Sequence, residues 1–86
     1  MVRNEVTYTV RGREERVSLM SRHPLTVRGA ERLVRARYRR CQSWHHSGNH
    51  DMVEARDGLA ECQGCGRLAP SASMVFVTRV EALHIR

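Results

Sequence analysis

Hydrophobic and polar residues alternate in the N-terminal part of the chain. Residues 5–10 place Val6, Tyr8 and Val10 on one face of a strand and threonines on the other. A less regular alternation follows over residues 16–20, after the turn-forming stretch Arg-Gly-Arg-Glu at residues 11–14. The pattern therefore predicts a β-hairpin over residues 5–20.

The period changes to that of an α-helix over residues 27–41. A step of about 100° per residue gathers the apolar residues in one arc: Val27, Ala30, Leu33, Val34, Tyr38 and Cys41. Four arginines fall together outside this arc, and we call them the arginine ridge: Arg28, Arg32, Arg35 and Arg39. The sequence predicts an amphipathic helix. Arg37 lies inside the apolar arc, so it extends to solvent, pairs with a buried acid or marks an uncovered part of the arc.

The second half of the chain reads as strands joined by loops. A polar, histidine-rich stretch over residues 42–50 is typical of a loop. Asp57-Gly58 separates residues 52–56 from residues 59–62 and predicts a second hairpin with a type I′ turn. Residues 70–73 read as a turn, and the β-branched run after them predicts a C-terminal strand over 73–85. Together these elements predict a small α+β protein, one domain over 1–86, with roughly five strands and one helix.

The length of the chain limits what it can be. A chain of 86 residues is enough for one small domain with a marginal core, which a bound metal would help to stabilise. No run approaches the roughly 18 apolar residues of a membrane helix, and the N-terminus does not resemble a signal peptide. We therefore expect no membrane partner and a cytoplasmic location.

Charge points to an anionic partner. The formal net charge is +6, and residues 28–40 carry six arginines against one acid, so most of the excess lies in the predicted helix. All fifteen basic residues are arginine. Because arginine has GC-rich codons, this bias suggests a high-GC bacterium or one of its phages. Arginine also offers phosphate a planar, multiple-donor group.

Cysteine and histidine form the candidate site. Cys62 and Cys65 are separated by two residues, so both thiolates can bind one Zn²⁺ ion, with glycines at 64 and 66 permitting a tight turn. Cys41 and one histidine from the loop can complete a tetrahedral structural site. Residues 59–67, Leu-Ala-Glu-Cys-Gln-Gly-Cys-Gly-Arg, resemble the second knuckle of zinc ribbons. The resemblance covers residues 41–67 and implies a zinc-ribbon-like unit.

The first knuckle departs from that pattern, because a histidine must stand where zinc ribbons have a second cysteine. The ligand set that we favour is Cys41, His45, Cys62 and Cys65, since a last helical turn would place residues 41 and 45 on one side. His46 and His50 are the alternatives. Three cysteines without a secretory signal argue against a disulfide framework. A redox pair and three structural thiols remain the other interpretations.

No catalytic motif stands out. The histidines and Asn49 contain the letters of an HNH nuclease, but they crowd into six residues instead of a longer ββα unit. A zinc site closed by sulfur is typical of a structural role, so we expect no enzyme.

The arginine ridge and Arg40 are the candidate binding residues. They predict contacts with a phosphate backbone, and zinc ribbons often serve nucleic-acid machinery, which makes DNA or RNA the favoured partner and a transcription-related regulator the favoured function. The alternative is a small zinc-stabilised adaptor, or a phage-type inhibitor, that binds an acidic surface of a host protein. Exposed strand edges also allow a homodimer.

Overall fold

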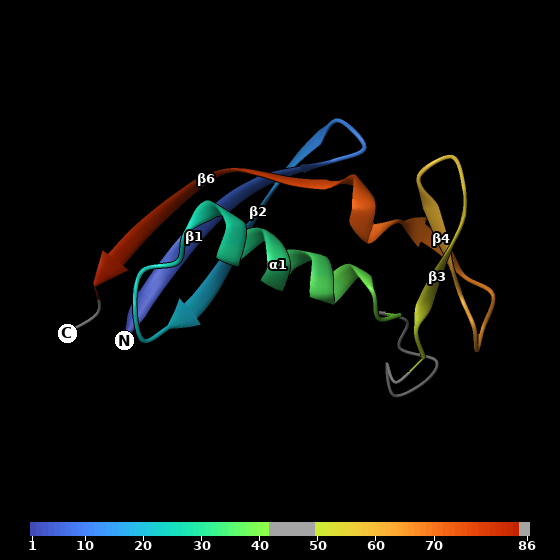
Figure 1. The fold of residues 1–86 in the computed structure, drawn as a ribbon, viewed down its shortest axis with the longest axis horizontal. Helices are drawn as coiled ribbons and strands as arrows, with labels where there is room; N and C mark the ends of the chain where they lie inside the picture. The colour runs from blue at the N-terminus through green and yellow to red at the C-terminus, as the bar shows by residue number, and fades with distance from the viewer. Residues whose placement is uncertain (42–49, 85–86) are drawn as a thin grey trace.

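The computed structural model describes residues 1–41 and 50–84. These residues form two three-stranded antiparallel sheets and one α-helix (Figure 1). The elements are β1 (Val2–Val10), β2 (Arg13–Ser21), α1 (Val27–Tyr38), β3 (Met52–Arg56), β4 (Leu59–Cys62), β5 (Leu68–Pro70), the 3-10 helix η1 (Ala72–Met74) and β6 (Val75–His84). The predicted α+β class is confirmed.

The first sheet has the strand order β2-β1-β6. The hairpin predicted over residues 5–20 is present, but its strands are longer and its turn is shorter than the sequence pattern indicated. Arg11 and Gly12 form the turn with φ angles of 52° and 79°, which are typical of a two-residue type I′ turn. Strand β1 begins before the alternating run because buried Asn4 occupies an inward position there and makes three hydrogen bonds.

Strand β6 pairs with β1 along its whole length, from Val2 opposite His84 to Val10 opposite Val75. The start of β1 and the end of β6 therefore lie at the same end of the molecule, far from the second sheet (Figure 1). The strand predicted over 73–85 begins instead at Val75, because Ser71 caps the short η1 helix by accepting the N–H of Ser73 at 3.2 Å. Residue 85 lies outside the described residues.

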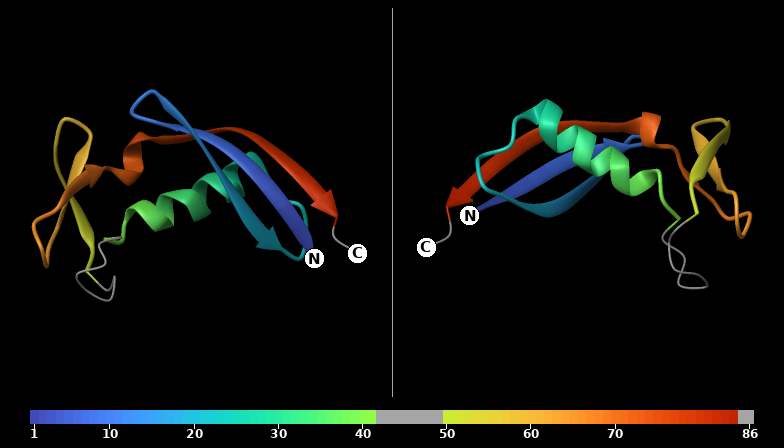
Figure 2. Two further views of the ribbon diagram at one scale, coloured as in Figure 1. Left: turned by 180° about the vertical axis from the view of Figure 1, so that it is seen from behind. Right: turned by 60° about the horizontal axis from the view of Figure 1, so that its bottom comes forward.

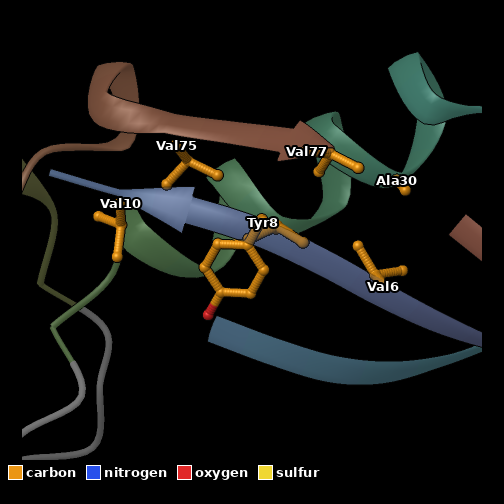
Figure 3. Packing of buried hydrophobic residues seen from close by; sticks show 7 residues of the cluster. Val6, Tyr8, Val10, Ala30, Val75 and Val77 are labelled. Atoms are coloured by element: carbon orange, nitrogen blue, oxygen red, sulfur yellow. The ribbon is translucent and has the colours of Figure 1, made fainter. Parts of the chain in front are cut away.

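Helix α1 covers one face of the first sheet, and the core lies between them (Figure 3). The buried cluster consists of Val6, Tyr8, Val10, Ala30, Val34, Val75 and Val77. Only part of the predicted apolar arc of the helix is buried, because Val27 and Leu33 are 49% and 44% exposed. A three-stranded sheet is narrow, so it covers the stripe through Ala30 and Val34 and leaves the flanks of the arc in solvent.

Helix α1 begins where the sequence pattern placed it and ends three residues earlier. The hydroxyl of Thr26 accepts the N–H of Gly29 at 3.0 Å and caps the first turn. At the other end Arg40 forms an isolated antiparallel bridge with Asp51. The helix has therefore ended before Cys41, and the expectation of a helix through residue 41 is wrong, because tertiary pairing competes with the last helical turn.

Two side chains of α1 also bind the outer edge of β6. Glu31 accepts the backbone N–H of Val77 at 3.0 Å, and Arg35 donates through Nε and Nη2 to the carbonyl oxygen of Val75 at 3.1 and 3.0 Å. The two side chains lie 3.8 Å apart as an i,i+4 ion pair. Helix and strand are thus joined by polar contacts as well as by the core.

The second sheet has the order β3-β4-β5 and lies beyond the C-terminal end of α1 (Figures 1 and 2). The hairpin predicted around Asp57 and Gly58 is confirmed, with φ angles of 51° and 74° at the two turn residues. Strand β5 was not predicted, because its three residues end in Pro70 and are too few to show a period. Proline is tolerated there because β5 is an edge strand.

Candidate metal centre

Main-chain pairing brings Cys41 to the second sheet. After α1, the N–H of Cys41 donates to the carbonyl oxygen of His50 at 3.1 Å, and the N–H of Met52 donates to Arg39 at 2.8 Å. Met52 then pairs with Cys62 across the β3–β4 ladder. Residues 39–41, 50–52 and 62 therefore lie side by side, which places the first cysteine next to the other two.

Cys62 is the last residue of β4, and Cys65 lies in the tight turn that joins β4 to β5. The N–H of Cys62 donates to the carbonyl of Arg67 at 2.9 Å, and the N–H of Gly66 donates back to Cys62 at 3.0 Å. Gly66 has a φ of 74°, which favours glycine. Two backbone N–H groups, of Gly64 and Cys65, donate to Sγ of Cys62 at 3.3 and 3.5 Å. The tight turn that the spacing of the cysteines predicted is therefore present, and it holds cysteines that could bind a metal ion.

The three sulfur atoms are close enough to bind one metal ion. Their Sγ atoms all lie within 4.8 Å of one another, and those of Cys41 and Cys65 are 3.8 Å apart. In a tetrahedral zinc site with Zn–S distances of about 2.3 Å, two sulfurs are separated by about 3.8 Å. Cys41 and Cys62 are buried and Cys65 is exposed. The residues present therefore fit a thiolate-bound metal without a rearrangement of the backbone.

Backbone donors favour the thiolate form at Cys62. The N–H of Cys65, and then that of Gly64, lowers the pKa of Cys62 to about 6, against the opposing effect of burial. The pKa of Cys65 is raised: the Arg67 N–H lowers it, but burial and the thiols of Cys62 and Cys41 together raise it by more. Three thiols this close cannot all ionise easily without a cation between them.

Of the three candidate histidine ligands, only His50 lies within the described residues. His45 and His46 belong to residues 42–49, outside the described residues. The helical argument for His45 fails, because Cys41 lies beyond the end of α1. His50 is described, and its ring packs against Gly64: a Cβ atom at that glycine would lie 2.6 Å from the ring. Sequence reasoning missed this contact, since nothing in the spacing links residues 50 and 64.

The arginine ridge divides into two parts. Arg28 and Arg32 are exposed on α1, and Arg39 is exposed at its C-cap. Arg35 is instead bound to the edge of β6, with its side chain 30% exposed and its guanidinium carbon 5.7 Å from the ring centroid of Phe76. Arg40 lies next to the metal centre and forms an exposed ion pair with Asp51 at 3.7 Å. The predicted binding residues thus do not form one continuous face.

Across residues 1–41 and 50–84, no helix has the length and apolar character needed to cross a membrane. Comparison with protein-family models, with curated proteins and with solved structures finds no match to this chain. The zinc-ribbon resemblance of residues 59–67 therefore has no support from a family match, and neither does the expected bacterial or phage origin. The cysteine cluster itself is the finding that remains: a group of three ligands that could hold a metal ion.

Proposed function

We propose that this chain is a non-catalytic zinc protein that binds nucleic acid through the exposed part of the arginine ridge, as a transcription-related regulator would. The metal has a structural role, with Cys41, Cys62 and Cys65 as three ligands and one of His45, His46 and His50 as the fourth. Closed sites rich in sulfur are usually structural, because they leave no position for a substrate. The ion would join the end of α1 to the β4–β5 turn.

The exposure of Arg28, Arg32 and Arg39 is the observation that carries the nucleic-acid proposal. From residue 28 to residue 39 the helix rises by roughly 16 Å, and duplex DNA presents one charge per about 1.7 Å of its axis. The only acid on α1, Glu31, is turned to the edge of β6 and paired with Arg35. The solvent-facing side of the helix is therefore positive along its length.

The metal is tested by native mass spectrometry and circular dichroism before and after a chelator at mildly acidic pH. We expect one zinc ion per chain, and its removal should unfold the second sheet because the ion joins separate segments of backbone. A metal-free chain with an unchanged spectrum would refute the structural role. Alanine variants of His45, His46 and His50, titrated with zinc, identify the fourth ligand as the variant that loses most affinity.

Nucleic-acid binding is tested by fluorescence anisotropy of labelled duplex DNA over a series of salt concentrations. The triple variant Arg28→Gln, Arg32→Gln, Arg39→Gln should bind more weakly. The slope of log affinity against log salt should become shallower by about 2.7, if each arginine contacts one phosphate.

The matched control changes three exposed arginines of the β1–β2 hairpin to glutamine: Arg11, Arg13 and Arg16. It lowers the formal net charge from +6 by the same three units. Equal affinities of the two triple variants would contradict the role of the ridge, because the effect would then be one of total charge.

A protein partner is the second candidate, and the exposure of Leu33 and Val27 beside the ridge favours it. Arginine together with apolar side chains is typical of protein interfaces. In that case the chain is an adaptor, or an inhibitor of a host protein, that binds an acidic surface. A complex of fixed stoichiometry that resists moderate salt, with no affinity for DNA or RNA, would select this function over the first.

A further inference from the structure

A cavity of about 480 Å³ opens beside the metal centre, between the end of α1 and the second sheet. Its volume lies in the range of small-ligand sites, about 300–1,000 Å³. The described residues that line it are Arg37, Tyr38, Arg40, Cys41, Met52, Arg67, Ala69 and Pro70. Helix α1, the start of β3, the β4–β5 turn and β5 therefore all contribute, so the cavity exists only in the folded chain.

Positive charge dominates the described walls of this cavity. Arg37 and Arg40 come from the end of α1 and its extension, and Arg67 comes from the turn that holds Cys62 and Cys65. Arg40 also pairs with Asp51 at the surface. None of the described lining residues is acidic. Guanidinium groups bind phosphate oxygens through paired hydrogen bonds, so the site favours a phosphate over a single point charge.

The nearby metal centre does not cancel this charge. A zinc ion with three thiolates and one neutral histidine carries a formal charge of about −1. Asp51, which pairs with Arg40, adds one more negative charge, and the three guanidinium groups still exceed the two together. Arg37, which falls inside the apolar arc of the helix, is exposed and lines the cavity.

Less polar side chains also line the cavity, among them Tyr38, Met52 and Pro70. The hydroxyl of Tyr38 is 3.1 Å from that of Tyr8, and the two rings meet edge to face with their centroids 6.2 Å apart. Because these contacts fix the Tyr38 ring, it can act as a surface for a flat group without a large loss of side-chain entropy. Aromatic side chains are the usual stacking partners of unpaired bases.

We propose that this cavity binds one nucleoside monophosphate unit. The phosphate is bound by Arg37 and Arg67, and the base lies against Tyr38 and Met52. The unit is either a free nucleotide or an unpaired nucleotide of a strand. The inference deepens the proposed function, because it assigns a single-nucleotide pocket next to the exposed ridge. The second of these ligands, an unpaired nucleotide of a strand, rests on that proposed function.

The test uses the zinc-loaded full chain and three probes: adenosine monophosphate, adenosine and inorganic phosphate. Calorimetry should show tighter binding of the monophosphate than of either fragment, since only it fills both halves of the cavity. Arg67→Gln and Arg37→Gln should each weaken that binding roughly tenfold or more, the usual effect of losing a hydrogen bond to a charged group. Zinc content and circular dichroism of each variant verify that the fold is retained.

Arg16→Gln is the control, because Arg16 is exposed on β2 and is not among the lining residues. It should leave the affinity for adenosine monophosphate unchanged. No binding by the unmodified chain, or an equal loss in all three variants, would overturn the proposal.

Two further probes, a short single strand and a blunt duplex, distinguish a free nucleotide from a nucleotide of a strand as the ligand. They also distinguish failure of this inference from failure of the proposed function. If Arg67→Gln weakens binding of a short single strand but not of a blunt duplex, the cavity holds an unpaired nucleotide of a strand. If only adenosine monophosphate depends on Arg67, the ligand is the free nucleotide. If adenosine monophosphate binds and no strand or duplex does, the nucleotide-binding cavity is supported and the nucleic-acid function is refuted. If the duplex binds and adenosine monophosphate does not, the nucleic-acid function is supported and the nucleotide-binding cavity is refuted.

Discussion

Replacement of Arg35 by glutamine should destabilise the fold, whereas the same change at Arg32 should not. Both residues belong to the arginine ridge, so the sequence pattern predicts the same role for them. In the structure Arg35 donates from Nε and Nη2 to the carbonyl oxygen of Val75, a residue that is 0% exposed. Removing the guanidinium leaves that buried carbonyl without its two donors and Glu31 without its cation.

The expected decrease in the free energy of unfolding follows from these contacts. A hydrogen bond to a charged group contributes about 1.5–3 kcal/mol, and because both donors share one acceptor we count about 2 kcal/mol. The ion pair with Glu31 spans 3.8 Å and is partly exposed, so it adds only about 0.3–0.5 kcal/mol. The contact with Phe76 adds about 0.5 kcal/mol. A total of about 3 kcal/mol corresponds to a fall in Tm of roughly 12–24 °C for a chain of this size.

The assay is urea and thermal unfolding of the zinc-loaded protein, followed by circular dichroism. Arg32→Gln is the control, and its free energy of unfolding should stay within about 0.5 kcal/mol of the unmodified chain. Glu31→Gln and Glu31→Ala add a graded test, since glutamine keeps an acceptor for the N–H of Val77 and alanine does not. Equal stability of the Arg35→Gln and Arg32→Gln variants would refute the reasoning, because the contacts with β6 would then contribute nothing.

Three further substitutions test the local geometry. Gly64→Ala places a Cβ atom 2.6 Å from the His50 ring, so zinc affinity measured against a chelating dye should fall, whereas Gln63→Ala in the same turn should leave it unchanged. Asn4→Ala removes hydrogen bonds to Leu19, Ser21 and Leu25 and should lower the free energy of unfolding by about 2 kcal/mol in urea titrations; an effect no larger than that of Arg3→Ala would contradict this. Gly12→Ala and Gly58→Ala both force alanine into a positive φ, at about 1–2 kcal/mol each, but only Gly58 has Met74 within 3.0 Å of the new Cβ. Gly58→Ala should therefore lower the Tm further than Gly12→Ala, and the opposite order would exclude Met74 as the cause.

The sequence pattern predicted those elements that depend on interactions between residues close together in the chain. The β3–β4 hairpin was predicted with its observed bounds because Asp57 and Gly58 accept positive φ angles and the flanking residues favour strands. The start of α1 was correct, while its end was not, since pairing between Arg40 and Asp51 draws the chain out of the helix. The pair Cys62 and Cys65 was predicted as a knuckle because the hydrogen bonds of that turn lie within six residues.

The parts of the site that depend on distant contacts could not be read in the same way. Arg35 and Arg32 have the same chemistry in the sequence, and only the position of β6 beside α1 gives Arg35 a backbone partner. Likewise, nothing in the spacing places Arg67 at the same cavity as Arg37 or the ring of His50 against Gly64.

The sequence by itself determined the α+β class, the two hairpin turns, the start of the helix and the identity of the cysteines that can bind a metal. The tertiary structure alone decided that β6 lies beside β1, that β5 completes the second sheet, that the arginine ridge is divided, and that a cavity lies beside the cysteine cluster. The physical reason is the range of the forces concerned. Turn geometry and side-chain period act over a few residues, whereas apolar faces can pack in many ways until long-range hydrogen bonds select one.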